Sequence, residues 1–253
     1  MLESYINKKL EQKDILLMTH IVMGYPSFKD SMEIVEQMVE AGVDLIELQI
    51  PFSEPMADGP VILRANQKSI ERGSTVKKCL DFAKKAAKGF DIPFLFMSYA
   101  NILHKFGMEK FSDQMTATNI KGAIVPDIPP EEGKEYIDAL EKNQLCPIFI
   151  YTPQTSDERM DYLASYAKGF IYCVARKGVT GKETQFSNEL ETYLARCRKA
   201  TNLPLAVGFG VKDRDDINYL KGKADVAIIG SETIRVVDKK GAKATSEFIK
   251  NLL

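Results

Sequence analysis

Two acidic residues stand where carboxylates could do chemistry. Residues 45–60 read LIELQIPFSEPMADGP, in which Glu47 interrupts an apolar run and Asp58 follows in a turn-forming stretch. A carboxylate inside a buried strand costs free energy unless its charge or its proton is used. One acid on a strand end and a second in the next loop could act as a general acid and a general base around one substrate. Taken singly, each has a structural alternative, a buried ion pair for Glu47 and a plain turn for Asp58.

Glycine-rich stretches follow three apolar runs in the second half of the chain. They are RKGVTG (176–181), GFG (208–210) and GSET (230–233). Glycine lets the backbone approach an anion closely, and the N-terminus of a helix supplies N–H donors. Each stretch alone is a weak signal, but together they predict a phosphate-binding site.

Eight short apolar segments must position these residues. Most are apolar almost throughout rather than alternating, which is typical of parallel strands covered on both faces. They span residues 15–24, 44–50, 92–98, 122–127, 146–151, 169–174, 203–210 and 224–230.

Segments of helical period lie between the apolar runs. Phe28, Met32, Val35 and Val39 form one stripe of a helix that Gly42 would end. Ser156 or Asp157 could cap a further helix. Other helices are expected within residues 1–12, 76–89, 131–143, 188–200 and 241–253.

Eight strand–helix units in 253 residues predict a single (β/α)8 TIM barrel over residues 1–253, with an extra N-terminal helix that could plug its bottom. An open doubly wound sheet is the alternative. In the barrel, active-site residues lie at the carboxyl ends of the strands. Because side chains alternate along a strand, Glu47 points into the barrel if Leu48 packs outward.

Composition narrows the function classes. The formal net charge is −1, which gives no reason to expect a nucleic acid or a membrane surface as partner. The four cysteines form no CxxC pair and there are two histidines, so neither a metal site nor a disulfide framework is expected. The polar N-terminus lacks the apolar core of a signal peptide, and no run approaches the ~20 residues of a membrane span. The expected location is cytoplasmic.

Residues 45–60 closely resemble a segment of the tryptophan synthase alpha chain family, whose usual form is [LI]E[LI]GxPFSDPxADGP. Further motifs of that family follow in order and cover nearly the whole chain: MGYP (23–26), MSYANIL (97–103), VPDIPPEE (125–132), RKGVTG, GFGV and GSE. The resemblance implies a lyase that splits indole-3-glycerol phosphate into indole and glyceraldehyde 3-phosphate by retro-aldol cleavage.

The resemblance also implies roles for individual residues. Glu47 matches the general acid/base, Asp58 the carboxylate that engages the indole nitrogen, and Tyr172 the tyrosine beside the glutamate. Tyr99 matches a pocket tyrosine, and Met97 and Ile62 could line the apolar pocket. Thr180 matches a threonine in the loop after the sixth strand, which closes over the substrate in the family. The positions that match the phosphate site are Gly181, Phe209, Gly210, Gly230 and Ser231.

No metal or organic cofactor is implied on this chain. The family's alpha chain docks on a beta chain that carries pyridoxal phosphate, in an alpha2beta2 heterotetramer, and the loop of residues 51–59 and the Asp127 loop would lie at that interface. Several positions depart from the usual pattern. His20 stands where Phe is typical, Gln49 where Gly is typical and Glu54 where Asp is typical, and Glu232 follows Ser231 where a small residue is common.

Two rival functions remain from the sequence. One is another barrel enzyme acting on a sugar phosphate, but the strand segments hold no lysine for a Schiff base. The other is a non-catalytic alpha-like subunit that binds a phosphate ligand and regulates a beta chain. The presence of both Glu47 and Asp58 argues against it.

Overall fold

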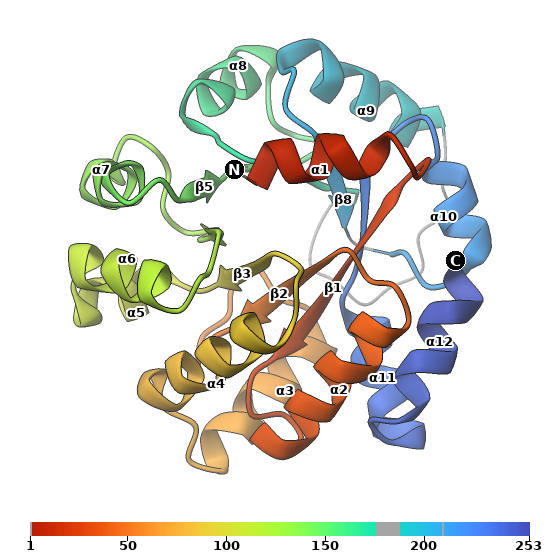
Figure 1. The fold of residues 1–253 in the computed structure, drawn as a ribbon. Helices are drawn as coiled ribbons and strands as arrows, with labels where there is room; N and C mark the ends of the chain where they lie inside the picture. The colour runs from red at the N-terminus through yellow and green to blue at the C-terminus, as the bar shows by residue number, and fades with distance from the viewer. Residues whose placement is uncertain (1, 176–187, 209) are drawn as a thin grey trace.

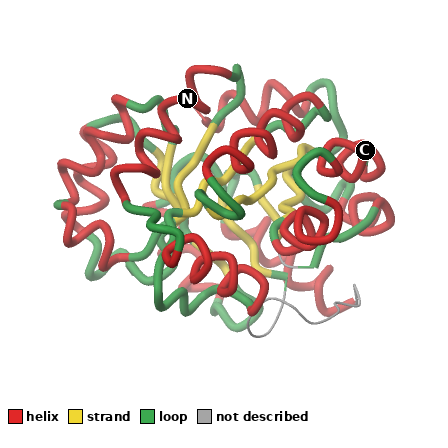
Figure 2. Tube along the Cα trace, turned by 90° about the horizontal axis from the view of Figure 1, so that it is seen from below, coloured by secondary structure: helices red, strands yellow, loops and turns green. Residues whose placement is uncertain are grey.

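The computed structural model describes residues 2–175, 188–208 and 210–253 of the chain. Parallel strands gather at the centre and helices surround them (Figure 1). Viewed from below, the helices form an outer layer around the strands (Figure 2). Among the described helices, none combines the length and the apolar character needed to cross a bilayer.

All eight predicted strand segments are present. The strands are β1 Leu16–Val22, β2 Leu45–Gln49, β3 Phe94–Met97, β4 Gly122–Ile124, β5 Cys146–Ile148, β6 Ile150–Tyr151, β7 Ile171–Val174, β8 Leu205–Gly208 and β9 Val226–Ile229. The helices are α1 Leu2–Leu10, α2 Phe28–Glu40, α3 Pro60–Glu71, α4 Val76–Gly89, α5 Ala100–Phe106, α6 Met108–Ala117, α7 Lys134–Lys142, α8 Asp157–Tyr166, α9 Asn188–Ala200, α10 Arg214–Leu220, α11 Ser231–Lys240 and α12 Ala244–Leu252.

The sheet closes on itself through one strand that is divided in two. Its order is β5-β4-β3-β2-β1-β9-β8-β7-β6, and every pairing is parallel. The predicted fifth strand appears as β5 and β6, separated by Phe149 alone. Its first half pairs with β4 and its second half with β7. The prediction of an eight-unit barrel is therefore confirmed, with its fifth strand turning from one neighbour to the other.

Alternation along the strands sorts side chains into two cores. Leu45 of β2 belongs to the cluster inside the barrel, whereas Ile46 and Leu48 belong to the larger cluster between sheet and helices. The expectation that Leu48 packs outward is thus confirmed, and Glu47, on the opposite face from it, points inward.

Helix α1 covers the amino-terminal end of the barrel. Leu2 and Ile6 are buried and join the inner cluster beside Cys146 and Phe170. A Cβ added at Gly169 would lie 2.9 Å from Leu2, so the fit is close. Figure 1 shows α1 lying across the barrel near β1 and β8. The predicted plugging helix is confirmed.

Helix predictions differ in accuracy. The expected ranges 76–89 and 188–200 are the observed α4 and α9. Helix α7 begins at Lys134 rather than near 131, because residues 129–133 form turns stabilised by backbone hydrogen bonds. The Glu132 amide donates to the Pro129 carbonyl at 3.1 Å, and the Gly133 amide to that of Pro130 at 3.3 Å. Ser156, and not Asp157, caps α8 by accepting from the Arg159 amide.

Candidate active site

Glu47 projects from β2 into the barrel at its carboxyl end. Only 2% of its surface is exposed. Its Oε1 lies 3.2 Å from Nδ1 of His20, and the two residues are register partners on neighbouring strands β1 and β2. Its Oε2 has no hydrogen-bond partner among the described residues. One carboxylate oxygen is therefore held, and the other is available to a substrate.

Asp58 lies in the loop after β2 and is held by two donors. Nε2 of Gln49 donates to Asp58 Oδ2 at 2.6 Å, and the hydroxyl of Tyr99 donates to the same oxygen at 3.0 Å. Burial raises the pKa of Asp58, and it outweighs the charge of His20 and the two hydrogen bonds, which lower it. The carboxylate is thus fixed in position but costly to ionise.

The loop that carries Asp58 is anchored from two sides. Oδ1 of the buried Asn66 on α3 accepts from the Phe52 amide at 2.9 Å. The rings of Phe52 and Tyr99 stack with centroids 5.1 Å apart, and the Ala57 amide donates to the Tyr99 hydroxyl at 3.2 Å. Tyr99 follows β3, so the sheet itself determines where Asp58 lies.

Tyr172 on β7 completes the group of ionisable side chains. Burial and the charges of Glu47 and Asp58 raise its pKa well above the ordinary tyrosine value. Its ring has room because residue 208 on the adjacent strand is glycine: a Cβ there would lie 2.7 Å from the Tyr172 hydroxyl. The structure therefore brings Glu47, Asp58 and Tyr172 to one end of the barrel.

The predicted wall residues lie around the same place. Met97 and Tyr99 continue the inner face of β3 and are 6% and 1% exposed. Ile62, on α3, packs in a separate small cluster with Val22 and Ile234. A Cβ at Gly230 would lie 3.7 Å from both Ile62 and His20, which places Ile62 beside the site.

Part of the predicted phosphate site can be located. Gly210 follows β8 with a φ of +120°, a conformation that favours glycine, and Gly230 caps α11, which begins at Ser231. Strands β8 and β9 are neighbours, so these turns lie at adjacent strand ends. Thr180, Gly181 and Phe209 lie outside the described residues.

Glu232 carries a negative charge next to this helix N-terminus. Its Oε2 accepts from Nη1 of Arg235 at 2.9 Å, one turn further along α11. The ion pair neutralises the charge locally and holds the side chain along the helix. Glu232 is therefore compatible with an anion at the N-terminus of α11.

Two polar residues near the acids were not predicted as their partners. His20 is 4% exposed and Gln49 is fully buried. Gln49 lies two positions after Glu47, so strand alternation could have placed it on the inner face. The contact of His20 with Glu47 depends on the register between β1 and β2, which the sequence does not show.

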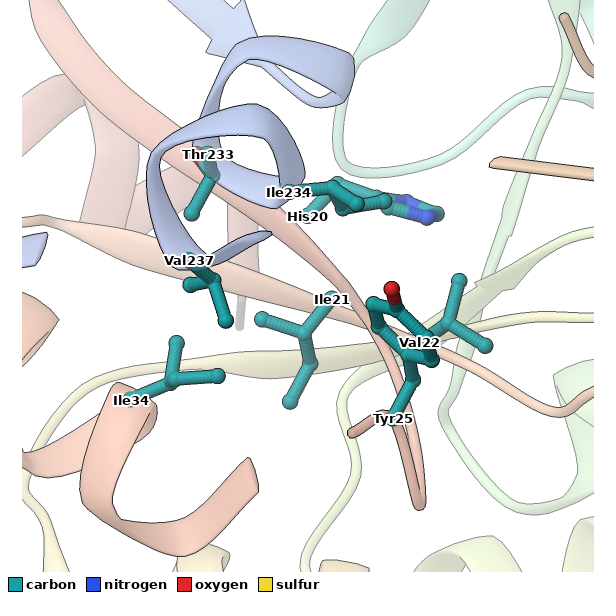
Figure 3. Close-up of a pocket in the computed structure, with 8 residues that line it drawn as sticks. All are labelled: His20, Ile21, Val22, Tyr25, Ile34, Thr233, Ile234 and Val237. Atoms are coloured by element: carbon teal, nitrogen blue, oxygen red, sulfur yellow. The ribbon is translucent and has the colours of Figure 1, made fainter. Parts of the chain in front are cut away.

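A small pocket lies behind His20, between β1, α2 and α11. Its lining is mostly aliphatic, and Figure 3 shows the imidazole pointing away from Ile34 and Val237. The pocket has room for little more than a water molecule, and Glu47, Asp58 and Tyr172 are not among the residues that line it. We therefore place the candidate site at the barrel mouth instead. The described residues contain no group of three or more His, Cys, Asp or Glu side chains arranged to hold a metal ion.

Comparisons of sequence and fold with known proteins identify the family. Residues 6–252 match the model of the family described as tryptophan synthase alpha chain. The chain belongs to the tryptophan synthase alpha chain family. A tryptophan synthase alpha chain of Desulforapulum autotrophicum is 65% identical over 100% of both chains, and that of Syntrophotalea carbinolica is 59% identical over 100% of both. A structure of Mycobacterium tuberculosis tryptophan synthase superposes with a TM-score of 0.93 at 27% identity, covering 99% of this chain and 96% of that one.

The activity of the tryptophan synthase alpha chain family is the cleavage of indole-3-glycerol phosphate to indole and glyceraldehyde 3-phosphate. This chain is accordingly a carbon–carbon lyase of tryptophan biosynthesis. The predictions of family, barrel fold and enzyme class are confirmed.

Proposed function

We propose that Glu47 is the general acid/base of this cleavage, that Asp58 engages the indole nitrogen, and that Tyr172 contacts the reacting part of the substrate. The observation that carries the proposal is the convergence of these three groups at the barrel mouth, where Glu47 keeps one carboxylate oxygen without a partner among the described residues. A buried acid with a free oxygen is suited to exchanging a proton with a bound substrate.

The reaction needs two proton movements and no added atom. A proton goes to C3 of the indole, which makes the ring able to accept the electrons of the C3–carbon bond. The adjacent glycerol hydroxyl gives up its proton as its carbon becomes the aldehyde. While C3 is protonated, positive charge develops at the ring nitrogen, and a fixed carboxylate such as Asp58 stabilises it more strongly than a neutral group.

The substrate's two ends would be held by different parts of the barrel mouth. The phosphate would bind at the turns after β8 and β9, where α11 begins at Ser231 after its N-cap Gly230. The first N–H groups of a helix have no partner within the helix and can donate to an anion. Gly210 would contribute its backbone, and Gly181 and Phe209 are further phosphate-site residues of the proposal. Thr180 is proposed as a substrate-contacting residue of the loop after the sixth predicted strand. Ile62, Met97 and Tyr99 would contact the indole ring with apolar surface.

A beta-chain partner is part of the alpha-chain role. We propose that the complex is the alpha2beta2 heterotetramer, that pyridoxal phosphate is bound by the beta chain alone, and that this chain needs no cofactor. The loop of residues 51–59 supports an interface here, because Met56 at its centre is 77% exposed and carries a large apolar side chain. The Asp127 loop would lie at the same interface.

The acid/base role is tested by Glu47→Gln. The amide keeps the size of the side chain but cannot exchange a proton in this way, so kcat for indole release should fall at least ~100-fold. Binding of glycerol phosphate should persist because the phosphate site is untouched. Indole formation is measured with and without a purified beta chain.

Glu36→Gln on the exposed face of α2 is the matched control and should leave kcat unchanged. Wild-type turnover by Glu47→Gln would overturn the assignment. No turnover by the wild-type chain, alone or with the beta chain, would favour the non-catalytic regulatory subunit.

A further inference from the structure

His20 is a polar residue on the inner face of the barrel, next to the proposed acid/base. Leu16 and Met18, four and two residues before it on β1, belong to the inner cluster, so alternation directs His20 inward as well. The imidazole is 4% exposed, and its Nδ1 lies 3.2 Å from Glu47 Oε1. Packing alone would favour an apolar side chain here, because burying an imidazole costs free energy.

The direction of the hydrogen bond follows from the chemistry of the two groups. An ionised carboxylate can only accept, so the proton between the pair lies on Nδ1 of His20 when Glu47 is ionised. The bond occupies Oε1 and leaves Oε2 without a partner in the described part of the chain. The carboxylate is thereby held with a defined oxygen directed to the substrate space.

His20 also lies close to the second acid. The charge of Asp58 acts on the imidazole, and Gln49, which donates to Asp58 Oδ2 at 2.6 Å, interacts with it too. The remaining nitrogen, Nε2, and Gln49 Oε1 are both buried without hydrogen-bond partners among the residues described. His20 thus contacts Glu47, and Gln49 contacts Asp58.

We propose that His20 is a positioning residue for Glu47: its imidazole holds one carboxylate oxygen and directs the other to the substrate. The proposal rests on the acid/base role of Glu47. His20 itself touches no reacting atom. It acts through the carboxylate, in the way that a partner group orients a catalytic base in other sites.

The electrostatic surroundings give this pair a pH dependence. Burial alone lowers the pKa of His20, but the charge and hydrogen bond of Glu47, with help from Asp58 and Gln49, outweigh burial, so the pKa is raised above 6.5. Within the described part of the chain, the titratable groups that act on the pair are Asp58 and Tyr172. From α2 and α11 the neighbouring side chains around His20 are uncharged: Ile34, Thr233, Ile234 and Val237.

The direction of the pH dependence follows from the raised pKa of His20. The charged pair is intact below the ordinary histidine pKa and is lost as the pH rises through the pKa of His20 in the folded protein. Lyase activity should therefore decline as the pH rises through the pKa of His20 in the folded protein.

A direct test uses the fact that the chain has two histidines. The other, His104, is exposed on α5, so His104→Asn leaves His20 as the single imidazole signal in an NMR titration. We expect a pKa above the ordinary value, and a clear fall when Glu47→Gln is added, because burial then dominates. A His20 signal that does not respond to Glu47→Gln would overturn the pairing. This readout needs no turnover, so it separates the failure of this proposal from failure of the lyase assignment.

A kinetic test compares two substitutions of His20. His20→Asn keeps a donor near the position of Nδ1 but carries no charge, so its kcat should equal that of the wild-type chain above the pKa of His20. His20→Phe removes the donor and should lower kcat about tenfold or more, with little change in KM. Both should lose the alkaline decline seen in the wild-type chain, and His104→Asn should retain it. Equal kcat and an unchanged pH profile in His20→Phe would show that residue 20 only fills space.

Discussion

At the residue scale, Asp58 shows that burial opposes the ionised carboxylate that the proposed reaction needs. Its two donors, Gln49 and Tyr99, and the charge of His20 favour the ionised form, but burial outweighs them and the pKa is raised. A carboxyl group with a raised pKa lowers the stability of the folded protein at pH values where it is ionised. The site therefore holds a charge that the fold would be more stable without.

We expect Asp58→Asn to make the folded protein more stable and less active. The amide oxygen can accept the same two hydrogen bonds without the cost of a buried charge, so the free energy of unfolding at neutral pH should rise. The gain should shrink as the pH falls through the pKa of Asp58, since the wild-type group then becomes neutral as well. Urea unfolding at several pH values measures the difference.

The same variant should release indole at least ~100-fold more slowly, because an amide cannot balance the charge on the ring nitrogen. Asp81→Asn, at an exposed position of α4, is the control and should alter neither quantity. A wild-type rate in Asp58→Asn would mean that the carboxylate is only structural.

The sequence was sufficient to predict which acids lie in the barrel, but not what they touch. Alternation within one strand is a local property, so the inward direction of Glu47 follows from Leu48 alone. Its bond to His20 depends on how β1 and β2 align, and a shift of one residue would separate the two side chains. Interactions across strands are fixed by the whole sheet and are absent from the local pattern.

At the scale of elements, the strands were easier to predict than the helix faces. The predicted stripe on α2, Phe28, Met32, Val35 and Val39, does pack against the core. The most buried residues of the helix are nevertheless Ser31, Ile34, Val35 and Met38. Ser31 is buried because its Oγ bonds the Gly24 amide and the Tyr25 carbonyl. A satisfied hydroxyl can occupy a core position, and hydrophobicity alone does not reveal it.

The division of the fifth strand was likewise not predictable from the sequence. Residues 146–151 read as one apolar run, but Phe149 separates the half that pairs with β4 from the half that pairs with β7. Curvature of this kind arises from closing the barrel. It depends on neighbours distant in sequence, so no local pattern predicts it.

Gly208→Ala tests how one strand positions a side chain of the next. The added Cβ would lie 2.7 Å from the Tyr172 hydroxyl, so the ring must move. We expect kcat for indole release to fall roughly tenfold or more, because small misplacements at a reacting centre are costly. Gly89→Ala at the end of α4, where nothing lies within 4 Å of the new atom, should leave kcat unchanged. Unchanged turnover in Gly208→Ala would mean that the exact position of Tyr172 is unimportant.

At the scale of the whole molecule, the barrel depends on contacts between the two ends of the chain. Strand β1 pairs with β9, and helix α1 covers the end of a barrel that the later strands complete. Ile6 of α1 is fully buried in this position. The first helix is therefore part of the hydrophobic core and not an appendage.

Ile6→Ala should lower the free energy of unfolding by about 2–4 kcal/mol, because it removes buried methyl groups and leaves a cavity. Lys8→Ala, on the exposed side of the same helix, is the control and should change stability little. Urea unfolding of the two variants gives the comparison. A loss in Ile6→Ala no larger than in the control would show that α1 contributes little to the core.

The position of α1 has a consequence for the order in which the protein is made. The ribosome releases the N-terminal segment first, but Leu2 and Ile6 pack against residues such as Phe170 and Val226, which are synthesised much later. Their apolar surface stays uncovered for most of translation. Helix α1 can therefore reach its native place only after β9 has been made, and the barrel cannot be completed before then.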